Sequence, residues 1–295
     1  MIIGVFWFLI SLFSMVLTQE QDNILKQKKT ADYIEKIDNF SLQAFNEQQQ
    51  ITYFIKANNY FSFKDKHTLL LKPKISTYNK DNKIDYILTS ARAHYLDNGD
   101  VQFKGQVNIQ SKSGVFYKIN TKSLLVSAAD GSIIGDEPVT YLEGNTKVTS
   151  EGIKVKSQQD IIRLVGKVHI DQGAGKTILT RDLFIDQSNS KKHYYSKNNT
   201  TYLTASNKIN AQGIDINVDK KITTLLGKVR ILQGSGVKID TENLLIDQSN
   251  ENEVYQTKKK VHYRSKVSDI RAIGMRYDVK NQKIKLTGGV SGRYE

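Results

Sequence analysis

The chain of 295 residues is long enough for one large or two ordinary domains, and its hydrophobic fraction of 39% excludes an intrinsically disordered protein. The absence of cysteine excludes disulfides, thiolate metal sites, a cysteine nucleophile and lipidation of an N-terminal cysteine. The formal net charge of +13 fits an anionic partner such as nucleic acid, anionic lipid or a phosphorylated glycolipid, and equally a solvated basic surface.

The first 18 residues, from Met1 to Thr18, are apolar and carry no charge. As a helix that rises about 1.5 Å per residue, they can cross most of a bilayer. The segment lacks the basic start and the small-x-small cleavage site of a secretory signal. We therefore expect an uncleaved single-pass anchor, with a removed signal as the alternative. Long domains are translocated whatever the charge of the flanking residues, so we expect the bulk of the chain outside the cytoplasm.

After the apolar segment, residues 30–37 are predicted to form a short helix or a linker, and no later segment has helical periodicity. The rest of the chain carries an internal repeat of 61 residues. The motif LFIDQSN from Leu183 recurs as LLIDQSN from Leu244. A column of glycines recurs at the same step and consists of Gly105, Gly166, Gly227 and Gly288. Matches at one fixed step indicate a repeat architecture.

Apolar and polar residues alternate around these glycines, which predicts strands with one buried face in an antiparallel sheet. The expected inward residues are Phe103, Val107, Ile109, Leu164, Val168, Ile170, Leu225, Val229 and Ile231. A glycine inside a strand often marks a bulge, so we expect the strands to bend there. Turn signals precede each segment at residues 97–100, 157–160, 219–221 and 280–283. The sequence therefore predicts an all-β fold with roughly four strands in each repeat.

No motif indicates catalysis. The stretch Gly173-Ala174-Gly175-Lys176-Thr177 is similar to part of a phosphate-binding loop, but the full motif needs glycine where Ile170 stands, so we expect a hairpin turn. The five histidines have no metal-ligand spacing, and no Gly-x-Ser-x-Gly elbow occurs. We expect no metal, no cofactor and no enzymatic activity. Aromatic residues beside lysine at 194–197 could stack bases, but an N-terminal span places them away from nucleic acid.

The segment from Ala272 to Asp278, followed by Leu286 to Val290, resembles the repeat of LptA/LptC/OstA-type lipopolysaccharide-transport proteins. An earlier set of residues resembles the first strands of LptC: Asn39 to Leu42, Phe45 to Glu47, Ala57-Asn58, Leu70 to Pro73, and Tyr78. Residues from about Glu151 onward look more like LptA. The expected organisation is an anchor (1–18), a linker (19–38), an LptC-like domain (39–150) and an LptA-like continuation (151–295), read either as a fused anchor and bridge or as an enlarged LptC-like domain.

The resemblance implies a β-jellyroll of V-shaped antiparallel strands whose apolar interior shields the acyl chains of lipopolysaccharide. The nine inward residues above would line this groove, and their sequence does not decide whether they pack together or admit lipid. The implied partners are lipopolysaccharide, an inner-membrane ABC transporter (a permease pair with its ATPase), and a periplasmic LptA-type bridge or an outer-membrane acceptor. The implied location is the inner membrane, with the bulk of the chain in the periplasm, and the implied role is non-enzymatic transfer toward the outer membrane.

Terminal strands of such a sheet leave backbone groups unpaired, which invites another β domain. The expected partner edges are Ile51, Tyr53 and Ile55 near the start, and Leu286 and Val290 at the end, where the fourth repeat stops after one segment. An ordinary edge strand is the equal alternative at each position. Two other functions stay open, namely a structural envelope scaffold with a closed core and a secreted LptA-like bridge.

Overall fold

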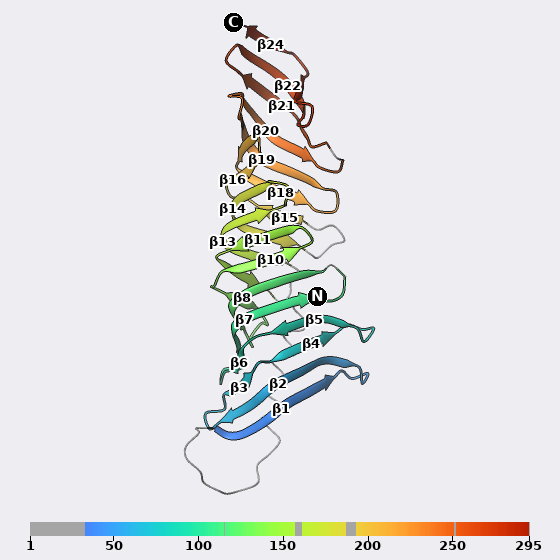
Figure 1. Cartoon of the computed structure of the whole chain (residues 1–295), viewed down its shortest axis with the longest axis vertical. Coiled ribbons are helices and arrows are strands. Elements are labelled where there is room, and N and C mark those ends of the chain that lie inside the picture. The colour runs from blue at the N-terminus through green and yellow to red at the C-terminus, as the bar shows by residue number, and fades with distance from the viewer. Residues whose placement is uncertain (1–32, 115, 157–160, 187–192, 251, 295) are drawn as a thin grey trace. The chain divides into compact units, whose positions relative to one another are not determined.

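The computed structural model describes residues 33–114, 116–156, 161–186, 193–250 and 252–294 (Figure 1). These residues form strands, turns and bends without any helix, and every strand pairing within each unit is antiparallel, so the predicted all-β antiparallel class is confirmed. None of the described segments forms a helix with the length and hydrophobicity that a bilayer crossing requires. The anchor predicted at 1–18 lies outside the described residues.

Packing divides the chain into two compact units, Met1–Asp160 and Ile161–Glu295, whereas the sequence suggested a boundary between residues 150 and 151. The strands of unit 1 are β1 (Tyr33–Phe45), β2 (Ile51–Phe63), β3 (Thr68–Leu71), β4 (Lys74–Tyr78), β5 (Ile84–Thr89), β6 (Arg92–Tyr95), β7 (Val101–Ser111), β8 (Tyr117–Val126), β9 (Ile133–Gly135), β10 (Val139–Glu143), β11 (Thr146–Ser150) and β12 (Gly152–Val155). The strands of unit 2 are β13 (Ile161–Asp171), β14 (Thr177–Asp186), β15 (His193–Ser196), β16 (Thr200–Leu203), β17 (Asn207–Ala211), β18 (Gly213–Asn217), β19 (Ile222–Gln233), β20 (Lys238–Asp247), β21 (Val254–Arg264), β22 (Ser268–Asp278), β23 (Lys283–Leu286) and β24 (Ser291–Tyr294).

Strand β1 corrects the prediction for residues 30–37. From Tyr33 the chain is a strand, and it pairs antiparallel with β2 through Phe45, so neither a helix nor a free linker occupies 33–38. Most side chains of β1 are exposed, which removes the alternating pattern on which a strand prediction depends. Backbone pairing with a neighbouring strand decides the structure here, a non-local effect that local sequence does not report.

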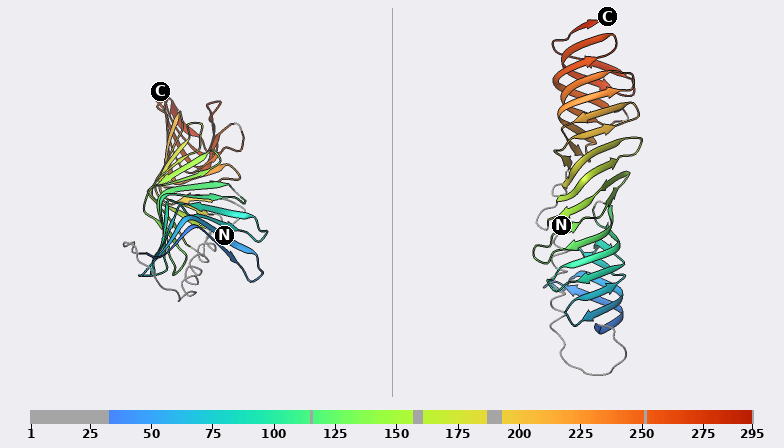
Figure 2. Two further views of the ribbon diagram at one scale, coloured as in Figure 1. Left: turned by 60° about the horizontal axis from the view of Figure 1, so that its bottom comes forward. Right: turned by 90° about the vertical axis from the view of Figure 1, so that its left-hand side faces the viewer.

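The long strands bend at β-bulges, as the inward glycines predicted. Between β13 and β14, Val165 and Gly166 together face the single residue Asp182, because the register passes from Leu164↔Leu183 to Lys167↔Arg181. Gly166 has a φ of +80°, which glycine adopts without the steric penalty of other residues. An extra residue of this kind kinks a strand and increases its twist. The bend is visible in Figure 2.

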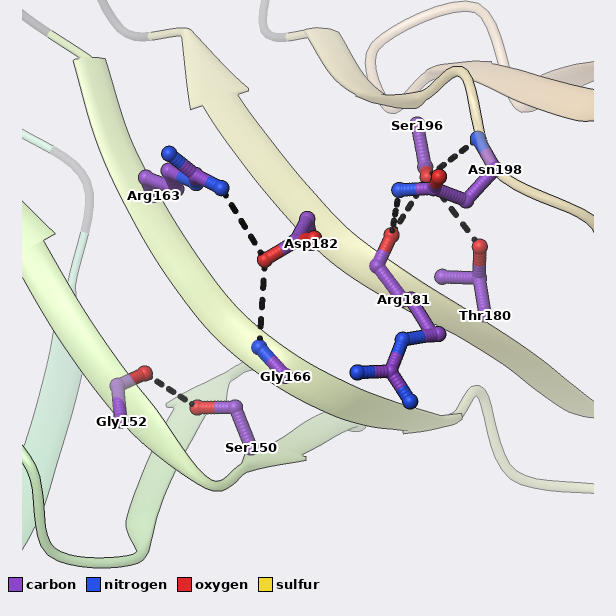
Figure 3. A network of polar contacts seen from close by, with 9 residues as sticks. All are labelled: Ser150, Gly152, Arg163, Gly166, Thr180, Arg181, Asp182, Ser196 and Asn198. Carbon is purple, nitrogen blue, oxygen red and sulfur yellow. Dashed lines mark hydrogen bonds and ion pairs between the residues drawn. The ribbon is translucent and has the colours of Figure 1, made fainter.

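An Asx side chain closes the bulges of β13 and β19. The Gly166 N–H donates to Asp182 Oδ1 at 3.2 Å, and one repeat later the Gly227 N–H donates to Asn243 Oδ1 at 2.9 Å. Both Asx residues have positive φ, +49° and +47°, a conformation that Asp and Asn tolerate better than most residues. Asp182 also forms an ion pair with Arg163 at 3.3 Å (Figure 3). Local side-chain chemistry therefore fixes the position of the bend.

The bends divide unit 2 into two arms, each with its own backbone hydrogen bonds. The first arm contains segments 161–164, 183–186, 193–196, 213–217, 222–226, 244–247, 254–257, 275–278 and 283–286. The second arm contains segments 167–171, 177–181, 200–203, 207–211, 228–233, 238–242, 260–264, 268–273 and 291–294. Strands β13, β14, β19, β20, β21 and β22 run through both arms. Unit 1 has the same plan, with its bulge at Gly105 and Gln106 of β7.

Buried hydroxyl groups hold the chain where it crosses the bend between β15 and β16. The Ser196 hydroxyl donates to the Arg181 carbonyl at 2.7 Å, and the Asn198 amide donates to the same carbonyl at 2.9 Å (Figure 3). Thr180, also buried, donates to Ser196 at 3.1 Å. One repeat later, the Thr257 hydroxyl donates to the Glu242 carbonyl at 2.9 Å. These bonds satisfy buried polar groups and keep the two arms joined at the bend.

The two edge strands that the sequence predicted have different places in the structure. Residues 51–55 of β2 do not form an edge, because β1 pairs with one side of β2 and β3 and β4 pair with the other. At the other end, β23 and β24 each pair with β22 and have no second partner among the described residues. Leu286 therefore lies on an edge strand, and Val290 lies in the bend between β23 and β24.

Replacement of Gly105 by alanine tests the packing at the bend of unit 1. Gly105 has a φ of +76°, and a Cβ atom there would lie 2.8 Å from Ala91 Cβ. Gly114 is the matched control, because its φ is +64° and a Cβ atom would contact nothing within 4 Å. We expect Gly105→Ala to lower the free energy of unfolding by about 1–3 kcal/mol more than Gly114→Ala, measured by urea denaturation. Equal losses would show that the close approach at the bend contributes no stability.

Candidate functional site

The two arms of unit 2 enclose an apolar interior. Leu164, Val168 and Ile170 project into it from β13, and their counterparts one repeat later, Leu225, Val229 and Ile231, do so from β19; each is at most 2% exposed. Large side chains from both arms fill the remaining space, among them Leu183, Tyr194, Leu244 and Tyr255 of the first arm and Ile178, Tyr202, Ile209 and Ile239 of the second. Six of the nine predicted inward residues therefore belong to one buried interior.

The other three predicted residues, Phe103, Val107 and Ile109, lie on β7 in unit 1. They are buried in the equivalent interior of that unit, with exposures of 1%, 1% and 5%. Stacked tyrosines, Tyr117 and Tyr141, fill part of the same interior, with ring centroids 5.5 Å apart. Each unit thus has an apolar interior of its own, built on the same plan.

Opposite the bend, the arms of unit 2 end in turns, and backbone hydrogen bonds do not join one arm to the other across this open side among the described residues. We call this open side the mouth. The tight turn at Gln172–Lys176, which joins β13 to β14, lies at the tip of the second arm and is the hairpin that the sequence predicted. The connection from β20 to β21, which includes Gln248 and Glu253, lies at the tip of the first arm. Contact between the arms at the mouth therefore depends on side chains.

Four polar side chains, two from each arm, meet across the mouth. The Lys176 ammonium forms an ion pair with the Glu253 carboxylate. The Tyr202 hydroxyl donates to Glu253 Oε1 at 3.2 Å, and Gln248 Nε2 donates to the Tyr202 oxygen at 3.0 Å. Lys176 and Tyr202 belong to the second arm, whereas Gln248 and Glu253 belong to the first. We call these four residues the latch.

Electrostatics make the latch sensitive to loss of either partner. Glu253 is the one buried charged residue among the described residues of unit 2, with 9% exposure. A buried carboxylate is costly unless it is paired and hydrogen-bonded, and Lys176 and Tyr202 supply both interactions. Burial raises the pKa of Tyr202, and the nearby Glu253 carboxylate raises it further. The Tyr202 hydroxyl therefore stays protonated and acts as a donor to Glu253.

No arrangement suited to a metal ion gathers among the residues that the structure describes. Three of the five histidines pair singly with a carboxylate: His67 with Asp65, His193 Nδ1 with Asp215 Oδ1 at 3.1 Å, and His262 Nε2 with Asp269 Oδ1 at 2.8 Å. One histidine and one carboxylate provide too few ligands for a tetrahedral site.

Sequence reasoning missed the latch because its members come from different repeats. One signal for Lys176 was present: the turn Gly173-Ala174-Gly175-Lys176 becomes Gly234-Ser235-Gly236-Val237 one repeat later, so the lysine departs from the repeat. A residue that differs between equivalent positions of two repeats indicates a role in one repeat only. Nothing in the sequence pairs Lys176 with Glu253.

Three successive stretches, residues 2–171, 156–234 and 232–295, match a family described as lipopolysaccharide-assembly, LptC-related. No curated protein matches the chain. The matched stretches extend over almost the entire sequence, and the LptA-like character of the repeats is consistent with them. The chain therefore belongs to the LptC-related family of lipopolysaccharide-assembly proteins.

Proposed function

We propose that this protein holds the acyl chains of lipopolysaccharide between the arms of its β units and passes the lipid from an inner-membrane ABC transporter toward the outer membrane. Membership in the LptC-related family implies a role in lipopolysaccharide transport. The proposal that acyl chains are held between the arms rests on the apolar interior of unit 2. Two arms enclose this interior, and among the described residues only side chains connect them at the mouth. The transfer needs no catalytic group, because binding and release suffice.

The energetics favour acyl chains in this interior. Each CH₂ removed from water contributes about 0.8 kcal/mol, so a few acyl chains supply a large binding energy. An acyl chain that enters replaces contacts between apolar side chains by contacts of the same kind. Because backbone hydrogen bonds run within each arm, the arms can separate at the mouth without breaking the sheet. Energy for directional movement would come from the transporter's ATPase.

The proposed location is the cell envelope, with Met1 to Thr18 as an inner-membrane anchor and the two units in the periplasm. The proposed partners are the transporter's permease pair and a periplasmic LptA-type bridge or outer-membrane acceptor. The edge strand that contains Leu286, together with Val290 beside it, is the proposed contact for the bridge, since β23 and β24 have unpaired backbone groups on one side. Near the other end, β1 takes the edge position that we had expected for Ile51, Tyr53 and Ile55.

The alternative is a structural envelope scaffold with a permanently closed core. The specific observation in its favour is that all nine inward residues are at most 5% exposed. In that case the interior side chains would stabilise the fold and never contact lipid. A probe inside unit 2 separates the two functions.

A photo-crosslinking residue at Leu225, in cells that make lipopolysaccharide, tests the proposed interior. Leu225 is fully buried between the arms, whereas Thr224, its neighbour on β19, projects from the opposite face and is the matched control. We expect the probe at 225 to crosslink lipopolysaccharide in an ATP-dependent manner and the probe at 224 to give little product. A folded protein that crosslinks at neither position would support the scaffold instead.

Charge reversal in the latch tests how the mouth opens. Lys176→Glu and Glu253→Lys each place like charges together across the mouth, so we expect each variant to accept a fluorescent acyl probe faster than the wild type and to unfold more easily. The double variant should recover both properties, with a coupling free energy of about 1 kcal/mol or more.

The exposed pair Lys36 and Asp38, whose side chains are 39% and 60% exposed, provides the control for this cycle. Lys36→Glu should leave the stability close to that of the wild type, because exposed ion pairs contribute little. Additive effects of the two latch reversals would mean that Lys176 and Glu253 do not act together.

A further inference from the structure

Positive charge is concentrated in the last four strands of the chain. Residues 254–294 contain 11 Lys and Arg residues against two Asp, a net charge of +9 out of the +13 of the whole chain. These residues form β21 to β24 at one end of unit 2. Such a concentration on adjacent strands produces a strong local positive potential, which a charge spread evenly over the chain would not.

Most of these cations lack an anionic partner in the structure. Within the described residues, Lys259, Lys260 and Arg271 form no ion pair, and all three are exposed. Arg276 of β22 lies directly opposite Lys285 of β23 in the strand register, and its guanidinium donates to Gln256 Oε1 at 3.4 Å.

The cations line two neighbouring depressions on the side of the second arm that faces away from the apolar interior. The larger is a groove of about 1390 Å³, whose walls include Lys228, Lys259, Lys260 and Arg271. The smaller is a hollow of about 650 Å³ at the tip of the same arm, which Lys266 and Arg293 line. We call Lys259, Lys260, Arg271, Lys266 and Arg293 the basic face.

Two acidic residues, Asp240 and Glu242, line the groove beside five cations, Lys228, Arg230, Lys259, Lys260 and Arg271, and so do not cancel this charge. Asp240 lies between Arg230 and Arg264 and forms ion pairs with both. Burial alone would raise the pKa of the Asp240 carboxyl, but the two arginines outweigh burial and hold the pKa below its usual value. Asp240 therefore stays ionised and matched by its own partners, and the basic face is left with an excess of positive charge.

We propose that the basic face binds the phosphate groups of a phosphorylated saccharide, such as the headgroup of an anionic glycolipid. Neighbouring strands lie about 4.8 Å apart, so cations on β21, β22 and the turn beyond them form a spread-out array and not one cradle. An array of this kind suits several phosphates on one extended molecule better than a single inorganic phosphate. The inference rests on the proposed lipid-carrying function, because a protein that passes lipopolysaccharide onward meets its phosphorylated headgroup, here on a face outside the apolar interior.

The test compares two triple variants of the full chain that remove the same charge. The first is Lys259→Gln, Lys260→Gln and Arg271→Gln in the basic face. The control is a triple Gln variant of three exposed lysines of unit 1, Lys80, Lys83 and Lys118. The probes are micelles of a bis-phosphorylated acyl disaccharide, micelles of the same disaccharide without phosphate, and inorganic phosphate as competitor.

We expect the basic-face variant to bind the phosphorylated micelles more than about tenfold more weakly than the wild type, with a smaller dependence on salt, and the control variant to bind within about twofold of the wild type. Equal losses in both variants would overturn the proposal, because net charge alone would then explain binding. Equal binding of phosphate-free micelles, or full competition by millimolar inorganic phosphate, would overturn it as well. Unchanged glycolipid binding with loss of an acidic protein partner would assign the face to protein docking.

Crosslinking at Leu225 separates this proposal from the proposed function. If the basic-face variant binds the headgroup normally while Leu225 still crosslinks lipid, the headgroup site is wrong and the lipid-carrying interior stands. If the wild type binds phosphorylated micelles but Leu225 never crosslinks lipid, the proposed function fails and with it the assignment of the headgroup to a transported lipid.

Discussion

The β-bulge in the middle of the long strands is the constraint on which the rest of the structure depends. At the bulges of β7, β13 and β19 a glycine has positive φ, and at those of β13 and β19 an Asx side chain also accepts its N–H; these bulges turn one continuous sheet into two arms. Without the bend, the alternating apolar residues would form one flat face that needs another layer to cover it. With the bend, the two arms cover each other, and a single chain of strands produces a buried interior without any helix among the described residues.

The same bend separates two kinds of interaction in space. Directional backbone hydrogen bonds lie within the arms, and buried hydroxyl groups such as Thr180 and Ser196 secure the bend. The mouth holds side-chain contacts, centred on Glu253. Hydrophobic contacts between the arms are non-directional, so they tolerate replacement by other apolar groups. A fold of this type is stiff along its strands and at its bend, and adaptable where its arms face each other.

Features that depend on the local sequence were predictable, and features that depend on pairing between distant segments of the chain were not. The alternation around Gly166 and Gly227 predicted buried columns, and the glycines themselves predicted bulges, because both signals depend on local backbone geometry. Strand β1 was missed because its side chains are mostly exposed and only its pairing with β2 makes it a strand. The predicted edge at Ile51 failed for the same reason. The latch was invisible because Lys176 and Glu253 belong to different repeats and approach each other only when the arms fold together.

The 61-residue repeat also sets how such a protein can change in length. Ile161 and Ile222 begin equivalent strands, and between them each arm receives four strand segments. At about 4.8 Å per strand, one repeat extends each arm by roughly 19 Å. Because the repeats that begin at Ile161 and Ile222 each carry their own bulge, Asx residue and corner hydroxyl groups, duplication of one such repeat adds a fixed increment of reach without any change to the rest. The distance that such a chain covers is therefore a multiple of one step, and gene duplication, more than gradual substitution, is the natural way to adjust it.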